Sequence, residues 1–414
     1  MAEEMELEKL EERVILVGVS LQDEEETRES LEELSELAAT AGAVTVGMVI
    51  QNREAVHPGS YIGTGKIAEV RELIAETGAT GIICDDELSP AQIRNLEQEL
   101  DCKIMDRTLL ILDIFAARAT TSEGKIQVEL AQLQYRLARL VGLGRSLSRL
   151  GGGIGTRGPG EKKLEMDRRL IKHRIAQLRR ELQEVKRHRE LIRERRKKNS
   201  VPVAAIVGYT NAGKSTLLNQ LTEGGVLAED KLFATLDPTT RTLKLKGGQE
   251  LLLTDTVGFI RKLPHHLIEA FQSTLEEAKY ADILLHVVDA SSSQMEKQMH
   301  VVYDTLKQLG VKDKTCITLF NKQDKRMEQG HVRDFHADYV LNISAYTGQG
   351  LEELKDTLEE ILTERQILIE RLYTYAEAGK IQLIRRFGQL LEEEYREDGI
   401  YVKAYVPQEI YGNV

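Results

Sequence analysis

The strongest chemical signal in the sequence is a phosphate-binding loop between an apolar strand and an apolar helix. The predicted strand 203–207 runs into the loop Gly208-Tyr209-Thr210-Asn211-Ala212-Gly213-Lys214-Ser215-Thr216. This is the GxxxxGK[ST] pattern in the strand–loop–helix context that makes it specific. The two glycines allow backbone N–H groups to face phosphate oxygens, Lys214 adds a positive charge, and the Ser215 hydroxyl can coordinate Mg²⁺. The loop therefore predicts binding of a nucleoside triphosphate together with magnesium.

A second motif predicts sensitivity to the terminal phosphate. The apolar run 251–254 ends in Asp255-Thr256-Val257-Gly258, a DxxG sequence. Asp255 can reach the Mg²⁺ shell through water, and the Gly258 N–H can bond the γ-phosphate. The loop that follows should therefore respond to hydrolysis.

A third pair of motifs predicts which base is bound. The strand 315–320 leads into Asn321-Lys322-Gln323-Asp324, and the run 341–343 leads into Ser344-Ala345. The Asp324 carboxylate can accept hydrogen bonds from N1 and the exocyclic amine of guanine, an arrangement that adenine lacks. All these motifs follow apolar strands, at the strand ends where such folds bind ligands. We therefore predict GTP as the substrate.

The threonine that completes the magnesium site must lie between the phosphate loop and Asp255. The segment Phe233–Arg241 offers Thr235, Thr239 and Thr240, and we select Thr235. The predicted catalytic residues are Lys214, Thr235 and Gly258, and the predicted magnesium ligands are Ser215 and Thr235. The predicted nucleotide-binding residues are Gly208, Tyr209, Thr210, Asn211, Ala212, Gly213, Lys214, Ser215, Thr216, Phe233, Ala234, Thr235, Leu236, Asp237, Asp255, Thr256, Val257, Gly258, Asn321, Lys322, Asp324, Ser344, Ala345 and Tyr346.

The elements that position these residues predict an α/β chain of four domains. Residues 1–124 alternate short apolar strands (14–19, 44–50, 81–85, 103–106) with helices (29–41, 65–77, 89–100), which indicates a small parallel α/β domain. Residues 200–363 form the GTPase domain, with a mixed, mostly parallel sheet flanked by helices. Residues 364–414 read as strand (367–375), helix (380–395) and strand (399–406), a small C-terminal α+β domain that is βαβ-like.

Residues 125–199 predict an antiparallel helical hairpin. Apolar residues follow heptad spacing in 126–140 and again in 171–192, on either side of a glycine-rich run, Gly151–Gly160. We expect arms of about 20–25 residues and a tip loop of about 15 residues, because glycine and proline at this density end a helix.

The hairpin is also strongly basic. Residues 125–198 contain 22 Lys and Arg against 8 Asp and Glu, in a chain whose net charge is −11. These cations either solvate a long exposed helix or contact a polyanion. We favour a polyanion, because Arg145, Arg149 and Arg157 surround the tip. A tip that served only as a linker would not need these positive charges.

The composition excludes several other classes of protein. With 414 residues, of which 41% are hydrophobic, the chain can bury several cores. It has three cysteines and no CxxC pair, which argues against a disulfide framework or a cysteine zinc site. No apolar run is long enough to span a bilayer, and the acidic N-terminus lacks a signal-peptide core. We expect a cytoplasmic monomer without stable membrane insertion.

The motifs resemble the HflX family of translation-factor-class GTPases. The strings that carry the resemblance are GYTNAGKST, FATLDPTTR, DTVGFIRKLP, NKQD, the tip GGGIGTRGPGE and the helix RRLIKHRI. The resemblance implies GTP hydrolysis stimulated by the large (50S) ribosomal subunit. It also implies dissociation of stalled or idle 70S ribosomes, especially under stress. The hairpin 125–198 and its tip Gly151–Gly160 would contact large-subunit RNA.

Three further features each have two interpretations. Phe259 follows DxxG, where many GTPases place a glutamine that orients water. It either simply packs or marks an enzyme that a partner must activate. Asn211 resembles an asparagine of potassium-dependent GTPases, which makes K⁺ a candidate cofactor. Gly63-Thr64-Gly65-Lys66 is either an ordinary helix start or part of a second, ATP-hydrolysing site.

Two alternatives to ribosome splitting remain open at this stage. One is a GTPase that assembles the large subunit, and the other is a nucleotide-gated regulator of a non-ribosomal protein or membrane complex. The basic hairpin counts against the second, because a protein partner does not require so basic a probe.

Overall fold

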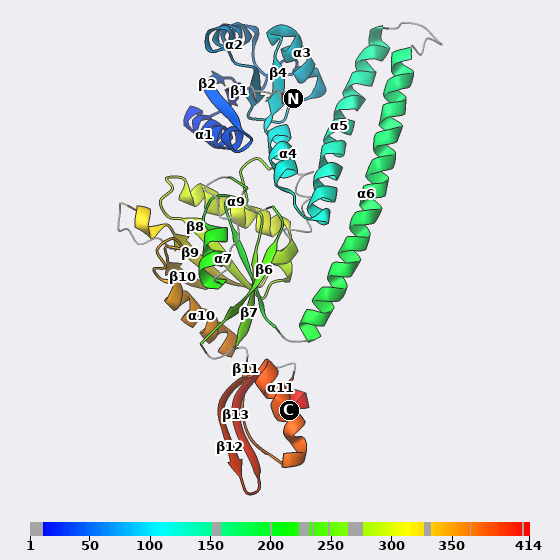
Figure 1. The fold of residues 1–414 in the computed structure, drawn as a ribbon. Helices are drawn as coiled ribbons and strands as arrows, with labels where there is room; N and C mark the ends of the chain where they lie inside the picture. The colour runs from blue at the N-terminus through cyan, green and yellow to red at the C-terminus, as the bar shows by residue number, and fades with distance from the viewer. Residues whose placement is uncertain are drawn as a thin grey trace, which may run out of the picture. The chain divides into compact units, whose positions relative to one another are not determined.

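The computed structural model describes residues 11–150, 159–198, 201–222, 232–233, 236–246, 249–263, 276–326, 333–364, 366–407 and 410–414. Their contacts divide the chain into two compact units. The first contains residues 1–183 together with 231–233 and 261–271, and the second contains 184–230, 234–260 and 272–414. Figure 1 labels most of the helices and strands of both.

The first unit begins with a four-stranded parallel sheet. Its strands are β1 (Glu12–Ser20), β2 (Ala43–Asn52), β3 (Gly81–Cys84) and β4 (Lys103–Asp106), in the order β2-β1-β3-β4. Its helices are α1 (Glu24–Thr40), α2 (Thr64–Thr77), α3 (Pro90–Leu100) and α4 (Arg107–Arg118). Because the order reverses direction after β1, the carboxyl ends of β1 and β3 flank a topological switch point.

The predicted elements of this sheet are present, and the predicted cap is confirmed. The Ser89 side chain accepts a hydrogen bond from the Gln92 N–H, and the Gln92 Oε1 accepts one from the Ser89 N–H, which forms a capping box at the start of α3. The sequence pattern did not predict helix α4. The Asp106 side chain caps α4 by accepting from the Leu109 N–H, and the helix buries five apolar residues, two of which are Ile111 and Phe115.

The predicted helical hairpin is confirmed. It consists of α5 (Ser122–Leu150) and α6 (Pro159–Lys198), which an apolar seam joins. The seam contains Ile126, Leu130, Leu133, Leu137, Ile171, Ile175, Leu178 and Leu182. Both helices are longer than expected: α6 has 40 residues, about 60 Å at 1.5 Å per residue. The connection is correspondingly shorter, since only residues 151–158, outside the described part of the chain, lie between them.

The second unit contains a six-stranded sheet in the order β10-β9-β8-β5-β7-β6. Its strands are β5 (Val203–Gly208), β6 (Thr239–Lys244), β7 (Glu250–Asp255), β8 (Ile283–Asp289), β9 (Thr315–Asn321) and β10 (Tyr339–Asn342). Only β6 is antiparallel to its neighbour, so the predicted mostly parallel sheet is confirmed.

Helices cover both faces of this sheet. Helices α7 (Lys214–Thr222) and α10 (Leu351–Glu364) contribute to one apolar cluster, which contains Leu217 and Leu354. Helix α9 (Met295–Gln308) contributes Met299 to a separate cluster with Val288 and Phe320. The strands are therefore buried on both sides, which explains their continuous apolar sequences.

The prediction for the C-terminal segment was partly wrong. The observed order is β11 (Gln366–Tyr373), α11 (Ala378–Phe387), β12 (Gln389–Arg396) and β13 (Gly399–Pro407), with an antiparallel sheet β11-β13-β12. The second half of the predicted helix 380–395 is therefore a strand, and the domain is not βαβ-like. Gly388 ends α11, where a Cβ atom would lie 2.5 Å from the Tyr405 carbonyl oxygen, and the chain then pairs with β13.

Candidate functional site

The phosphate loop connects β5 to α7 in a conformation that requires glycine at two positions. Gly208 has φ +154°, and a Cβ atom there would lie 2.2 Å from the Val287 carbonyl oxygen. Gly213 has φ +97°, and its Cβ would lie 2.3 Å from the Asn321 amide nitrogen. The loop therefore packs directly against β8 and β9, and helix α7 begins at Lys214 with its N-terminus at the loop. Such a helix start favours a bound anion.

Lys214 is a buried cation. Its side chain is 7% exposed, and its Nζ donates to the Tyr209 carbonyl oxygen at 2.7 Å. Burial lowers the pKa of Lys214 to about 8, although Asp255 opposes the shift. A Cβ atom on Gly258 would lie 3.0 Å from this Nζ, so the DxxG glycine and the lysine lie together. This places a cation and a backbone donor where the sequence predicts the γ-phosphate.

Ser215 and Asp255 meet at the predicted metal position. The Ser215 Oγ donates to Asp255 Oδ2 at 2.7 Å, and Asp255 is fully buried at the end of β7. A hydroxyl and a carboxylate are oxygen ligands of the kind Mg²⁺ prefers. Among the described residues no group of three or more His, Cys, Asp and Glu side chains could hold a metal ion.

The choice of the magnesium threonine falls outside the described residues, since Ala234 and Thr235 are not among them. The structure does place the two competing threonines. Thr239 and Thr240 begin β6, and the Thr240 Oγ1 lies 3.0 Å from the Thr254 Oγ1 in the paired strand β7. Thr235 as the ligand stays a prediction.

The residues around Gly258 contribute mainly backbone groups. The Thr256 hydroxyl donates to the Ile206 carbonyl oxygen at 2.7 Å, and Val257 and Phe259 are buried. The Phe259 N–H donates to the Gly208 carbonyl at 3.1 Å, and the Thr210 N–H donates to the Phe259 carbonyl at 2.8 Å. The Phe259 side chain therefore packs in the interior, where it cannot orient water, and activation by a partner stays a prediction. The side chains of residues 256 and 257 are also buried, so their predicted contacts with the nucleotide would use backbone groups.

Three segments meet at the predicted guanine end. The Asn321 Nδ2 donates to the Ala212 carbonyl at 2.8 Å, and its Oδ1 accepts from the Ala345 N–H at 2.8 Å. The Ser344 Oγ donates to Asp324 Oδ1 at 2.5 Å. Asn321 is 2% exposed. Its side-chain amide connects the phosphate loop to the 344–345 turn through these two hydrogen bonds. Asn321 thus positions these two loops, and its predicted contact with guanine beside Asp324 stays a prediction.

Three other predicted nucleotide-binding residues, Lys322, Tyr346 and Phe233, differ in burial and in their contacts. Lys322 forms an ion pair with Asp289 at 2.7 Å, and Tyr346 is 81% exposed. Phe233 was predicted to contact the nucleotide, but its side chain packs edge-to-face on Phe115 in the first unit, with ring centroids 4.7 Å apart. That packing commits the ring to the protein interior, and a contact of residue 233 with the nucleotide stays a prediction.

The second candidate nucleotide site is occupied by protein contacts. The Gly63 N–H donates to the Gln51 Oε1 at 2.9 Å, and Lys66 pairs with Glu69 at 2.7 Å. These contacts account for the start of α2 as an ordinary helix end.

Sequence reasoning missed His286, a buried histidine in β8. It is 1% exposed, and its Nδ1 has no hydrogen-bond partner among the residues that the structure describes. Burial lowers the pKa of His286 to about 4, with Lys214 adding to the shift and Asp334 opposing it. A single histidine inside the apolar run 283–288 was the only sequence signal.

This histidine predicts a loss of stability in mild acid. The unfolded chain takes up a proton near pH 6.5, whereas the folded chain does so only near pH 4. Stability therefore falls as pH drops through 6.5, by about 2 kcal/mol at pH 5, and levels off near pH 4. We expect His286→Gln to remove this part of the pH dependence, measured as the difference in unfolding free energy between pH 7 and pH 5. An equal pH dependence in wild type and variant would contradict the assignment, and His300→Gln on the exposed face of α9 is the control.

The fold and this arrangement define a P-loop GTPase. The phosphate loop, the Ser215–Asp255 pair and the Asn321–Asp324 segment lie at the carboxyl ends of β5, β7 and β9. Family models agree. Residues 28–116 match the N-terminal region of a GTP-binding GTPase, residues 118–196 match its middle region, and residues 203–322 match a 50S ribosome-binding GTPase.

Individual relatives identify the family. The GTPase HflX of Lacrimispora saccharolytica is 68% identical over 414 residues, covering 100% of this chain and 98% of the relative. The GTPase HflX of Escherichia coli is 42% identical over 392 residues, with 94% and 91% covered. A GTP-binding protein from Sulfolobus solfataricus, solved in complex with GDP, is 26% identical, with 85% and 99% covered and a TM-score of 0.45. This chain belongs to the HflX family, and it is a GTP hydrolase.

Proposed function

We propose that this protein binds the large (50S) ribosomal subunit and dissociates stalled or idle 70S ribosomes into subunits, with GTP hydrolysis stimulated by the ribosome. The observation that carries the proposal is the combination in one chain of a GTPase domain and a basic two-helix arm. The match of residues 203–322 to a 50S ribosome-binding GTPase supports the choice of partner. Searched over the described residues, the structure has no helix long and apolar enough to cross a membrane.

The arm is suited to contact RNA. Its two helices pack against each other through their own apolar seam. An ion pair between the helices adds to this packing: the Arg174 guanidinium donates to both Glu129 carboxylate oxygens, at 2.7 and 2.9 Å. The arm can therefore stand without support at its tip. Basic side chains on its remaining surface can contact phosphates, which supply most of the affinity of proteins for nucleic acids.

The proposed hydrolytic site uses residues with distinct roles. Lys214 neutralises charge on the β- and γ-phosphates, and the Gly258 N–H donates to the γ-phosphate. Ser215, with Thr235 as a predicted partner, would hold Mg²⁺, and Asp255 would orient its water. The ion, when bound, supplies charge neutralisation for phosphoryl transfer. Asp324 reads guanine, and Asn321 holds the loops in register. A dependence of the rate on K⁺ that Asn211→Ser abolishes would add potassium to the cofactors.

Hydrolysis by the protein alone should be slow and should rise at least tenfold when large subunits are added. The physical reason is that Phe259 is buried and pinned to the phosphate loop, so this side chain cannot orient the attacking water. Release of phosphate, measured with and without 50S and with 30S as the control, tests this. Full activity of the isolated chain would contradict a ribosome-stimulated mechanism.

Sedimentation of 70S ribosomes with the protein and a non-hydrolysable GTP analogue tests the function itself. Conversion of 70S particles into subunits supports ribosome splitting. Binding restricted to large-subunit precursors would indicate an assembly GTPase instead. Absence of any ribosomal binding would favour the regulator of a non-ribosomal partner.

A further inference from the structure

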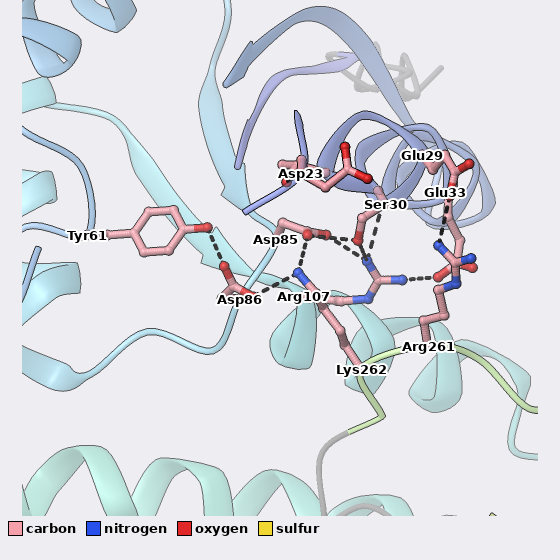
Figure 2. Close-up of polar contacts among 11 residues, drawn as sticks. Asp23, Glu29, Ser30, Glu33, Tyr61, Asp85, Asp86, Arg107, Arg261 and Lys262 are labelled. Atoms are coloured by element: carbon pink, nitrogen blue, oxygen red, sulfur yellow. Dashed lines mark hydrogen bonds and ion pairs between the residues drawn. The ribbon is translucent and has the colours of Figure 1, made fainter. Parts of the chain in front are cut away.

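Two residues just beyond the γ-phosphate sensor are bound by acidic side chains of the first unit. The Lys262 ammonium lies 2.5 Å from Asp85 Oδ2 and 2.8 Å from Asp86 Oδ1, and the Arg261 guanidinium lies 3.5 Å from Glu29. Figure 2 shows these pairs at the carboxyl end of β3, beside helix α1. The carboxyl end of β3 belongs to the topological switch point of the first sheet, where α/β domains place their ligands. Here the ligand is a segment of the same chain.

The acidic end of this contact is rigidly built. Asp85 is 1% exposed, and it accepts from Arg107 at 2.6 Å and from Ser30 at 2.8 Å. Arg107 also pairs with Glu33. Burial opposes ionisation of Asp85, but Arg107 and Lys262 outweigh it and hold the pKa of this carboxyl below its usual range. The carboxylate is therefore charged at neutral pH and available to Lys262.

The loop 85–88 continues from this contact to the middle of helix α5 in the basic hairpin. The Leu88 N–H donates to Asp106 Oδ2 at 3.0 Å, and the same carboxylate accepts from two α5 side chains. These are the Tyr135 hydroxyl at 2.6 Å and the Arg139 guanidinium at 2.7 Å. Asp106 is fully buried, and it also caps helix α4. One short loop thus contacts Lys262 at its start and the anchor of α5 at its end.

Only a short segment separates the γ-phosphate sensor from Lys262. Phe259 is bonded through both backbone groups to the phosphate loop, and only Ile260 separates it from Arg261. Each residue spans at most about 3.5 Å of extended chain. Lys262 itself has φ +52°, a left-handed conformation that is uncommon for a residue with a side chain. A displacement at Gly258 therefore has only three residues, 259–261, over which to be taken up before it reaches the Lys262 pairs.

A second, independent contact involves the predicted first switch. Phe233, two residues before Thr235, is buried edge-to-face against Phe115 of α4. Helix α4 starts at Arg107, which holds Asp85. Residues adjoining both predicted γ-phosphate sensors are thus bound by the same small part of the first unit.

We propose that the pairs of Lys262 with Asp85 and Asp86 couple the state of the nucleotide to the middle of helix α5, in the basic hairpin, through the loop 85–88. The inference rests on the proposed function only in taking the hairpin as the arm that contacts the ribosome. The exchange of GTP for GDP changes the bonding of Gly258, and Lys262 transmits that change as a gain or loss of ion pairing. Lys262 and Asp86 are positioning residues, because they are proposed to act through the segment 259–262 and the loop 85–88.

Hydrogen exchange of the full chain without ribosomes tests the coupling. Amide exchange in 85–88 and 135–139 is compared with GDP and with a non-hydrolysable GTP analogue bound. We expect at least a threefold difference between the two states in the wild type. Lys262→Gln should abolish this difference and leave nucleotide affinity within about twofold, whereas Lys307→Gln on α9 should retain it. Persistence of the difference in Lys262→Gln, or its absence in the wild type, overturns the proposal.

A charge exchange separates coupling from a merely structural role. Lys262→Glu places three carboxylates together and should abolish the nucleotide-dependent difference. Adding Asp86→Lys restores a pair of opposite charges, and the difference should return to at least half of its wild-type size. Failure of this rescue in a folded double variant counts against the ion pair as the coupling element. Since the experiment contains no ribosome, a failure to split 70S particles would refute the proposed function and leave this result unaffected.

Discussion

Asp324→Asn is expected to lower affinity for guanine nucleotides roughly ten- to a hundredfold, since a lost charge-assisted hydrogen bond costs about 1.5–3 kcal/mol. It should also raise affinity for xanthine nucleotides. Guanine presents N1–H and an exocyclic amine, two donors that a carboxylate accepts together. An asparagine amide offers one acceptor and one donor, which matches the N1–H and the 2-carbonyl of xanthine. The expected result is therefore a change of preference and not only a loss of binding.

The structure shows why this carboxylate is well placed to discriminate. The Ser344 hydroxyl donates to Asp324 at 2.5 Å, and Asn321 ties the neighbouring turn to the phosphate loop. Base and phosphate subsites are thus held in one frame, so a change at Asp324 should not disturb Lys214. Titration calorimetry with GDP and XDP measures both affinities without turnover. Asp304→Asn, on the exposed face of α9, is the matched control. If Asp324→Asn binds GDP as tightly as the wild type, the guanine assignment is wrong.

Replacing residues 151–158 by a short Gly-Ser turn is expected to abolish ribosome splitting while GTP affinity changes by no more than about twofold. The replaced residues lie outside the described part of the chain, but the seam that holds the arm does not include them. Leu130, Ile175 and Leu178 are buried in that seam, so α5 and α6 should remain paired without the native tip. A glycine-rich backbone with arginines can fit between RNA phosphates and unpaired bases, which a rigid helix end cannot do.

Light scattering of 70S dissociation measures splitting, and pelleting with 50S subunits across a salt series measures binding. Neutralising Arg145, Arg149 and Arg157 together should flatten the salt dependence by up to about one unit of slope per lost phosphate contact. Three lysines outside the arm, Lys279, Lys307 and Lys312, provide the control for a change of net charge. Splitting at the wild-type rate by the tip-replaced protein would show that the tip is only a linker.

The sequence alone determined the elements that form because of residues close together in the chain. The phosphate loop can be identified from the sequence, because its two glycines and its lysine must lie between one strand and one helix. The cap at Ser89 depends on residues only three positions apart. The hairpin follows from a heptad spacing that the structure confirms in the seam of α5 and α6.

The sequence pattern failed where neighbours in space overrode local preference. Residues 389–396 carry an apolar pair and three glutamates that suit a helix, yet they form β12 because β13 offers them a ladder of hydrogen bonds. The tertiary structure also buries the Phe233 ring against Phe115, a contact that no local pattern predicts. It engages the Asn321 amide with two other loops, which the base-recognition motif does not specify.

Only the tertiary structure decided what Lys262 contacts. It lies four positions beyond Gly258, where the sequence shows an ordinary basic residue, and its partner Asp86 is 176 positions away. No periodicity or motif links two charges at that separation, since their pairing depends on the order of strands in a sheet and on where one loop meets it. The chemistry at the nucleotide was therefore readable from short, local patterns. The connection from the nucleotide to the rest of the molecule was not, because it consists of ion pairs that folding alone brings together.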